Sequence, residues 1–590
     1  MSFQPDYALT GRGGVGTGAQ QLAAISSFGG EERLRLPFNL QRRHLFLFVV
    51  AIVAMAAVAI AAGVKPILGA GMIVAVAAAF AVALNEMLGL ILLAALAAAT
   101  SGLARGIPVP GIRFSEVLIG GIGIVLLTTA RKFVRWSTLD WLALLYCVAT
   151  FALGAWDLLS QGEAFNSGEI QLLLGPCQFL LLYRATLVTA RTPERRRLAL
   201  RLIIGASVPV ALLAIGQQFN FPGVRSLLVT LTGTNFYAAG SNTARATGPF
   251  PLWHNLGGYL LMVLLAIIAV QTQRVEGIMS RRTMLLIAAL DAVALVETLD
   301  LAPLAALVAG ILIIGIWLGG LNRVLIGTAV VLVVGMLVFG GRLDARFSSE
   351  FGRAPGTARS SLVPQTIQYR FDLWTGELLP LLKGHVATGY GPTLPAQIQN
   401  FPYTESQYIN LLYRGGVVLL SVWAALFIAM GFAGVRAARD ADPFQRALGV
   451  AVATAVICLV FMQVLEAYFV DDGTPQVLWM LLGLLAFHDV PSARALDRAP
   501  AFDDPANRRA WAANVAMAFE TLDPSTQELL RLAYSHQMTT PELVSVMGLN
   551  ADAINRWQSS AMQRLALHAN MAPAAAERLL RSGTVPLGAW

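Results

Sequence analysis

Long uninterrupted runs of apolar residues, separated by short polar segments, dominate the chain from residue 44 to residue 488. Runs of about 17 to 25 apolar residues have the length that an α-helix needs to cross the hydrocarbon core of a bilayer. A membrane β-barrel would instead show short segments of alternating apolar and polar positions, and these runs are continuous. The pattern therefore predicts an all-α fold, a polytopic transmembrane helical bundle.

The boundaries of the runs predict about fourteen membrane spans. The spans fall at 44–63, 67–84, 86–102, 113–130, 138–156, 168–188, 199–219, 255–271, 283–299, 302–319, 323–340, 408–433, 447–469 and 474–488. Very few polar residues separate neighbouring runs at 84–86 and at 299–302, so these two divisions are the least marked in the pattern.

Basic residues in the short connections predict the orientation of the bundle. They cluster before the first span and after the fourth, sixth, eighth and twelfth spans, as Arg33, Arg35, Arg42, Arg43, Arg131, Lys132, Arg135, Arg191, Arg195, Arg196, Arg197, Arg201, Arg274, Arg281, Arg282, Arg436, Arg439 and Arg446. With fourteen spans all of these clusters fall on one side, which the positive-inside rule makes cytoplasmic. Both termini are then cytoplasmic, and the two long segments 220–254 and 341–407 are outer loops.

Composition divides the chain into three parts. The whole sequence of 590 residues is 56% hydrophobic and 13% charged, whereas soluble proteins carry roughly a quarter charged residues. Residues 1–43 are rich in Gly, Ala and Ser, carry no cleavable signal pattern, and are predicted to be a disordered cytoplasmic segment. Residues 44–490 form the predicted transmembrane domain, and the polar residues 491–590 form a predicted cytoplasmic helical tail.

Charge and cysteine usage add two expectations. The net charge of +8 is explained by the inner-face arginines, which would contact anionic membrane lipids. Cys147, Cys177 and Cys458 all fall inside apolar runs. We expect them to be small core residues rather than a disulfide or a metal site.

The first outer loop ends in the stretch 245–258, which reads Arg-Ala-Thr-Gly-Pro-Phe-Pro-Leu-Trp-His-Asn-Leu-Gly-Gly. It brings Arg245, His254 and Asn255 directly before the apolar run 259–270. Polar and ionisable groups at the mouth of a membrane helix are costly to keep there and usually mark a functional site. We therefore expect this stretch to carry chemistry.

The second outer loop holds basic residues on the face where the positive-inside rule disfavours them. These residues are Arg342, Arg346, Arg353, Arg359, Arg370 and Lys383. An anionic ligand would explain the set, and ordinary pairing with Asp344, Glu350, Asp372 and Glu377 is the alternative for any single arginine.

Two motifs in these loops resemble a known superfamily. Arg245-x-x-Gly-x-Phe, followed by His254-Asn255 and Leu-Gly-Gly-Tyr-Leu, is similar to the first outer loop of the O-antigen ligase and O-antigen polymerase (Wzy-like) superfamily. Arg370 with Trp374 four residues on, then Gly389-x-Gly, then the polar start of a helix that reaches Gly415-Gly416, is similar to its large outer loop. The resemblance covers roughly residues 44 to 489.

The resemblance implies a GT-C-like transferase that uses neither a metal nor a cofactor. Such an enzyme takes glycan from an undecaprenyl-diphosphate carrier and passes it to a glycan or lipid acceptor at the outer leaflet of the bacterial inner membrane. The diphosphate leaving group carries concentrated negative charge, which guanidinium groups bind bidentately and stabilise as the glycosidic bond breaks. We assign this role to Arg245 and Arg370, with Asn255, Trp374 and Tyr408 as supporting substrate-binding residues.

The general base is left open between two residues. His254 is one candidate, because a side chain that titrates near neutrality suits a base. The resemblance implies a positioning role for this first-loop position, and a capping or hydrogen-bonding role at the start of its helix is the alternative. Many ligases of the superfamily carry a His-Asn pair where this chain has Glu405-Ser406. Either Glu405 replaces that imidazole or the chain follows the polymerase branch of the superfamily, and a charge that the helix dipole favours is the alternative for Glu405.

Other polar residues have simpler interpretations. Gly384, Gly389 and Gly391 are expected to form tight turns. Asp471-Asp472-Gly473 is expected to be a solvated loop rather than a calcium site. Asp291 and Glu297 either pair with an arginine or line a cavity.

Within the tail, residues 520–567 resemble the helix-turn-helix of sigma-factor region 4, with the turn at Gly548 to Asn550. Its second helix carries only Arg556 and Arg564 as basic residues, whereas DNA-reading domains show a basic face. We therefore expect the tail to bind a protein rather than DNA.

Two alternatives to a transferase come from other functional classes. A multi-span transporter or exporter of a lipid or glycan would show inverted repeats and interrupted helices near the midplane. A membrane-tethered regulator would work through the helix-turn-helix of the tail.

Overall fold

A computed structural model of the protein describes residues 79–104, 113–129, 136–162, 167–233, 245–320, 340–348, 350–351, 363–392, 404–469, 472–485, 512, 515–569, 576–577 and 580–581. The predicted N-terminal segment 1–43, the first span and the span 323–340 lie outside these residues, as does most of the second span.

The described residues are helical, and they include no strand. Those of the predicted transmembrane domain form α4 (Glu86–Leu96), α5 (Phe114–Thr129), α6 (Thr138–Gln161), α7 (Ser167–Thr189), α8 (Pro193–Gln218), α9 (Val224–Thr232), α10 (Trp253–Thr272), α11 (Arg281–Glu297), α12 (Leu301–Trp317), α14 (Gln365–Leu373), η1 (Trp374–Leu378), α15 (Leu379–Leu381), α16 (Gln407–Ala437), α17 (Pro443–Met462) and α18 (Thr474–Gly483). The all-α fold class predicted from the sequence is confirmed for this part of the chain.

Six of these helices, α6, α7, α8, α10, α16 and α17, are long and apolar enough to cross a membrane. Three more, α4, α5 and α12, are apolar but shorter. Helix α11 was predicted as a span and belongs to neither group. The membrane-spanning character of the protein therefore rests on these six helices, and the count of about fourteen spans stays a prediction.

Helix α10 is the centre of the bundle. Its side chains are buried from His254 through Ile267, and it packs against α8, α11, α12, α17 and α18. Two glycines near its start allow this close packing. A Cβ on Gly257 would lie 2.9 Å from Pro303 of α12, and a Cβ on Gly258 would overlap the Thr474 hydroxyl of α18.

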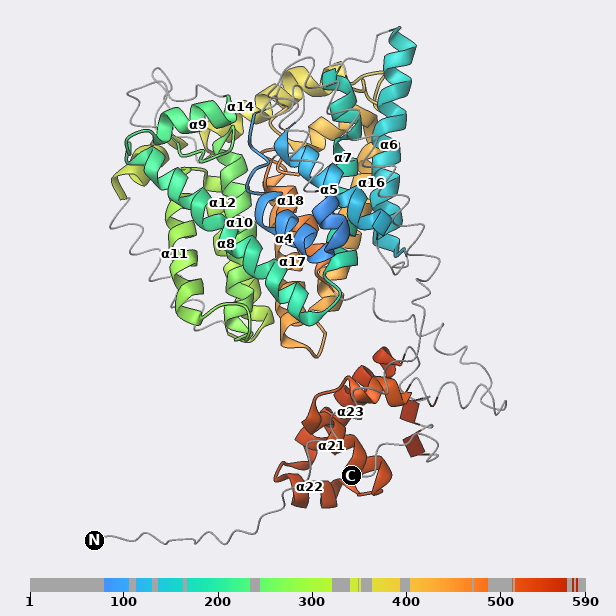
Figure 1. Cartoon of the computed structure of the whole chain (residues 1–590). Helices are drawn as coiled ribbons and strands as arrows, with labels where there is room; N and C mark the ends of the chain where they lie inside the picture. The colour runs from blue at the N-terminus through green and yellow to red at the C-terminus, as the bar shows by residue number, and fades with distance from the viewer. Residues whose placement is uncertain are drawn as a thin grey trace, which may run out of the picture. The chain divides into compact units, whose positions relative to one another are not determined.

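The two long loops meet at one end of the bundle. Figure 1 shows α9, from the first loop, and α14, from the second, at the same end, with the α10–α11 connection at the opposite end. At that opposite end the Arg201 guanidinium of α8 donates to the backbone oxygens of Gly277 and Ile278. The end that carries α9 and α14 is called the loop end below.

Helix α17 is shorter than its apolar run predicts. It ends at Met462, seven residues before the predicted boundary, and residues 463–469 form turns. These turns lie against the head of α16, where the Gln407 N–H donates to the Gln463 carbonyl oxygen at 2.9 Å. The mostly apolar side chains of 464–469 predicted that the helix would continue to residue 469. In the structure α17 ends at Met462, where the chain turns to contact the head of α16.

Helix α16 is broken one-third of the way along its length. Gly415 (φ −163°, ψ 16°) and Gly416 (φ 62°, ψ −160°) are not helical. The Val417 N–H donates to the Val386 carbonyl oxygen at 2.8 Å, so the preceding loop satisfies a backbone group that the break releases. A Cβ on Gly416 would overlap the backbone of Ala387, which is why glycine is required here.

The tail has a hydrophobic core of its own, built from residues between Ala512 and Leu580. Its helices are α21 (Pro524–Leu530), η2 (Arg531–Ser535), α22 (Thr540–Met547) and α23 (Ala551–His568). Gly548 ends α22 in the left-handed region at φ 66°, and the Asn550 side chain caps α23. These positions match the turn that the sequence predicts, while the likeness to a sigma factor stays a prediction.

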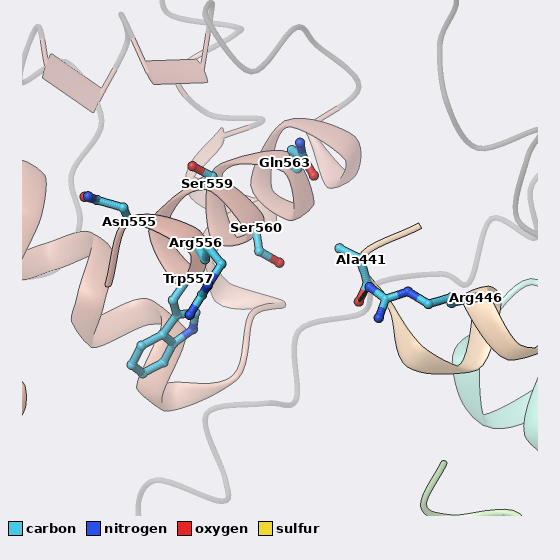
Figure 2. Close-up of a pocket in the computed structure, with 8 residues that line it drawn as sticks. All are labelled: Ala441, Arg446, Asn555, Arg556, Trp557, Ser559, Ser560 and Gln563. Atoms are coloured by element: carbon cyan, nitrogen blue, oxygen red, sulfur yellow. Dashed lines mark hydrogen bonds between the residues drawn. The ribbon is translucent and has the colours of Figure 1, made fainter. Parts of the chain in front are cut away.

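Helix α23 offers few cations. Figure 2 shows Arg556, Ser559, Ser560 and Gln563 along this helix. The other basic residue, Arg564, lies 3.6 Å from the carboxylate of Asp523. The pKa of Asp523 is lowered, first by a hydrogen bond from Ser525. Whether the tail binds protein or DNA stays a prediction.

Candidate functional site at the loop end

The stretch 245–258 is held in place by α8 before it enters α10. The Gln217 side chain of α8 accepts hydrogen bonds from the backbone N–H groups of Thr247 (3.0 Å) and Gly248 (2.9 Å). Gly248 has φ 54°, which lets the chain turn there. This stretch is therefore a fixed part of the bundle, and it presents Arg245 and His254 from a rigid backbone.

Arg245 is a half-buried cation at the start of this stretch. Its guanidinium lies 4.5 Å from the ring centroid of Trp253 and forms no hydrogen bond or ion pair with any described residue. Burial is the largest cause of the lowered pKa of Arg245; the charges of Arg346 and Arg370 also lower it, and those of Asp300 and Glu350 act in the opposite direction. A desolvated guanidinium close to other cations is arranged to receive an anion.

Arg370 lies in the last turn of α14 and contacts the head of α16. Its Nη2 is 2.5 Å from Oε2 of Glu405, and its Nε is buried without a hydrogen-bond partner among the described residues. The Trp374 indole N–H, one turn further along, donates to the Thr404 carbonyl oxygen at 2.9 Å. Trp374 thus fixes α14 and η1 against the segment that carries Glu405.

Glu405 has a strained backbone. Its φ of 52° lies in the left-handed region, which an L-residue with a Cβ occupies at a cost of about 1 to 2 kcal/mol. Strain of this kind collects at functional sites, where the surrounding structure enforces it. Here the ion pair with Arg370 and the buried neighbours Thr404 and Ser406 hold the residue in place.

We expect Glu405→Gly to unfold at a higher temperature than Glu405→Ala. Both variants lose the carboxylate, but only glycine relieves the positive φ, a difference of about 1 kcal/mol. Thermal unfolding of the purified protein measures it. The control is Glu377, an exposed residue of η1, where glycine should be the less stable of the two substitutions. Equal midpoints at position 405 would contradict the strain.

A second carboxylate lies between His254 and Arg370. Oε2 of Glu466 is 3.9 Å from His254 Nδ1 and 3.9 Å from Arg370 Nη2. The His254 ring stands edge-on to Tyr468, with 6.0 Å between centroids. The Tyr468 hydroxyl in turn donates to Oδ2 of Asp300, the N-cap residue of α12, at 2.9 Å. Imidazole, guanidinium and carboxylates therefore meet in one cluster.

The structure brings together five of the seven predicted site residues: Arg245, His254, Arg370, Trp374 and Glu405. Asn255 is buried beside His254, and its Oδ1 has no hydrogen-bond partner among the described residues. Tyr408 contacts a different region. Its hydroxyl donates to the Val460 carbonyl oxygen of α17 at 2.7 Å, so it braces α16 against α17.

The sequence did not single out Glu466, Tyr468 or Asp300. Glu466 and Tyr468 fell inside a predicted span, where the apolar neighbours hid them. An available signal was the acid at 466 within an otherwise apolar run, because a carboxylate is costly inside a membrane. Asp300 lay at the weakly marked division 299–302.

Two of the remaining basic residues of the second loop pair with acids, and Lys383 is exposed. Arg346 pairs with Glu350, as the sequence allowed, and Arg342 pairs with Glu297 of α11. Asp291 accepts a hydrogen bond from Ser207 at 2.7 Å. Arg353 and Arg359 lie outside the described residues. For Arg342 and Arg346, pairing with an acid is therefore part of the reason why basic residues occur in this loop.

The glycines of the second loop serve its turns. Gly384, Gly389 and Gly391 have φ of 91°, 72° and 75°. A Cβ on Gly389 would lie 2.5 Å from the Tyr413 carbonyl oxygen, so the loop packs directly on the head of α16. The expected turn role of these glycines is confirmed.

Asp472 does not lie in a solvated loop as predicted. It is buried and paired with Arg113 at the start of α5, whereas Asp471 lies outside the described residues. A carboxylate paired across two helices is compensated without water, and sequence spacing alone could not reveal a partner 359 positions away.

Within the described ranges, no three His, Cys, Asp or Glu side chains converge as metal ligands do. The three cysteines are free thiols.

Comparison with protein-family models gave no match, and comparison with curated proteins gave none either.

Proposed function

We propose that the protein is a membrane glycosyltransferase of the O-antigen ligase or polymerase type. It transfers glycan from an undecaprenyl-diphosphate carrier to a glycan or lipid acceptor on the outer face of the bacterial inner membrane. In this proposal the bundle is GT-C-like with about fourteen spans, the loop end faces outward, and both termini are cytoplasmic. The tail binds a protein partner.

The observation that carries the proposal is the half-buried guanidinium of Arg245, which no described residue engages in a hydrogen bond or ion pair and which lies near Arg346 and Arg370. Concentrated positive charge at a desolvated site fits a ligand with concentrated negative charge, and a diphosphate is such a ligand. Arg370 lies near Arg245, and its guanidinium contacts the carboxylate of Glu405. Phosphate oxygens of the substrate would bind this guanidinium in place of that carboxylate or beside it.

The transfer step needs a base as well as an anion site. The acceptor hydroxyl loses its proton, its oxygen attacks the anomeric carbon, and the bond to the diphosphate breaks with the electron pair on the leaving oxygen. His254 and Glu405 both lie within the cluster that contains Arg370. His254 is the better base of the two, because Glu405 is engaged by the guanidinium of Arg370 at 2.5 Å.

The broken helix α16 supports a second candidate, a transporter of a lipid-linked glycan. Discontinuous membrane helices are typical of secondary transporters, in which the break lines the substrate site. In this protein the backbone groups at Gly415 and Gly416 are instead packed against residues 386–389 of the loop. The transferase is therefore the stronger proposal.

A reconstituted assay tests both candidates. The purified full-length protein is placed in liposomes with a fluorescent polyprenyl-diphosphate oligosaccharide and an unlabelled acceptor. We expect longer glycan products and release of one polyprenyl diphosphate for each glycan transferred. Movement of the labelled lipid between leaflets, with no new glycosidic bond, would overturn the transferase in favour of the transporter.

A further inference from the structure

Glu466 occupies a position that neither its sequence context nor the proposed diphosphate site explains. It follows the early end of α17, and the hydrogen bond between Gln407 and Gln463 brings its segment to the head of α16. Its carboxylate is 16% exposed and lies 3.9 Å from both His254 Nδ1 and Arg370 Nη2. One carboxylate oxygen is thus shared by the proposed base and the proposed phosphate ligand.

We propose that Glu466 is a positioning residue for the transfer reaction, which orients His254 as the base and links it to Arg370. The inference rests on the proposed function of the same site. The carboxylate lies 3.9 Å from Nδ1, within ion-pair range but beyond hydrogen-bond range, and its charge favours the tautomer in which Nδ1 carries the ring proton and Nε2 accepts.

This orientation defines the path of the proton. The acceptor hydroxyl gives its proton to Nε2 of His254, and the resulting imidazolium is stabilised by the carboxylate of Glu466. The acceptor oxygen forms the new bond to the anomeric carbon while the old bond to the diphosphate breaks. The negative charge that leaves with the diphosphate lies toward Arg370, on the other side of Glu466.

The neighbouring aromatic rings keep the imidazole in this orientation. Tyr468 stands edge-on to the His254 ring at 6.0 Å, and Trp253 does so at 6.2 Å. Tyr468 is itself held by its hydrogen bond to Asp300. Rotation of the His254 ring away from Glu466 would disturb these contacts.

Several charged groups surround His254, and among the described residues Glu466 lies within ion-pair distance of it, at 3.9 Å. The others are Asp300 on the N-terminus of α12, Glu405 at the head of α16, Arg370 on α14 and Arg245 before α10. The two arginines favour the neutral imidazole, and the acids favour the imidazolium. Removal of the Glu466 charge should therefore lower the affinity of the imidazole for a proton.

The test compares Glu466→Gln with Glu377→Gln in the full-length protein. Glu377 is an exposed acid of η1 in the same outer segment, so its variant loses the same charge outside the cluster. The imidazole of His254 is titrated by NMR on ¹⁵N-histidine-labelled protein, with its signal assigned by its loss in His254→Gln. The pH dependence of the transfer rate is measured in the liposome assay.

In Glu466→Gln we expect the His254 titration midpoint to fall by about one pH unit. The acid limb of the rate profile should move to lower pH by the same amount, and the plateau rate should fall about tenfold or more because the ring is no longer oriented. Glu377→Gln should change neither curve.

An unchanged His254 titration in Glu466→Gln would overturn the proposed contact. A changed titration with an unmoved acid limb would overturn the assignment of His254 as the base and so the role of Glu466. If the wild-type protein transfers no glycan at any pH, the proposed function itself fails, which is a different result from an active wild type with unmoved curves.

Discussion

Alanine at position 245 or 370 is expected to reduce the initial rate of glycan transfer by about 100-fold or more. Removal of one preorganised donor to a developing negative charge typically costs two to three orders of magnitude in rate. Arg245 contributes a desolvated guanidinium with no carboxylate partner among the described residues, and Arg370 contributes one that faces two carboxylates. The rates are measured in the liposome assay at saturating acceptor.

Lysine substitutions separate charge from geometry. Arg245→Lys and Arg370→Lys keep one positive charge but lose the planar fork that binds two oxygens at once. We expect roughly tenfold losses, between the wild type and the alanine variants. Lys383→Ala removes an exposed cation from the segment that follows α14 and should retain activity. Full activity in both alanine variants would contradict the arginine assignment.

The buried ion pair between α6 and α7 should give the largest effect on stability. Arg184 Nη1 lies 2.9 Å from Oδ1 of Asp140, and their side chains are 7% and 0% exposed. Ser137 also donates to Oδ2 of Asp140 through its N–H (2.7 Å) and its hydroxyl (2.6 Å), which caps α6. We expect Asp140→Asn to lower the free energy of unfolding by about 3 to 5 kcal/mol, because it leaves Arg184 charged and buried.

A double-mutant cycle identifies the cause. The loss in Asp140→Asn combined with Arg184→Met should be smaller than the sum of the single losses, because each single substitution already removes the same ion pair. Glu86→Gln is the matched control, since Glu86 pairs with Arg195 at 2.5 Å but is 38% exposed. Exposed pairs contribute about 1 kcal/mol or less. Thermal and denaturant unfolding in detergent measure all four variants, and equal losses in Asp140→Asn and Glu86→Gln would refute the buried-pair explanation.

Much of the fold follows from local pattern. The apolar runs predict the helices α5, α7 and α10 with ends within two residues of those observed, whereas α8 starts six residues earlier and α6 ends five residues later than predicted. Span formation depends on the length and polarity of one continuous segment, so the sequence carries this information directly. Helix ends set by tertiary contact were predicted less well, as the early end of α17 at Met462 shows.

Part of the candidate site was also predictable. Arg245, His254 and Arg370 stood out because they are polar residues next to apolar runs or basic residues on the disfavoured face. Glu466 and Asp300 did not stand out, because each is a single acid whose role depends on neighbours more than 95 positions away in the sequence. No local pattern records such a contact.

The sequence by itself determined that this is a helical membrane protein with two polar loops and a separate helical tail, because burial in a bilayer acts on each apolar segment alone. The tertiary structure decided which charges meet. It paired Arg370 with Glu405, placed Glu466 between Arg370 and His254, and left Arg245 stacked on Trp253. Electrostatic energy depends on distances in space rather than along the chain, so only the folded arrangement could specify these contacts.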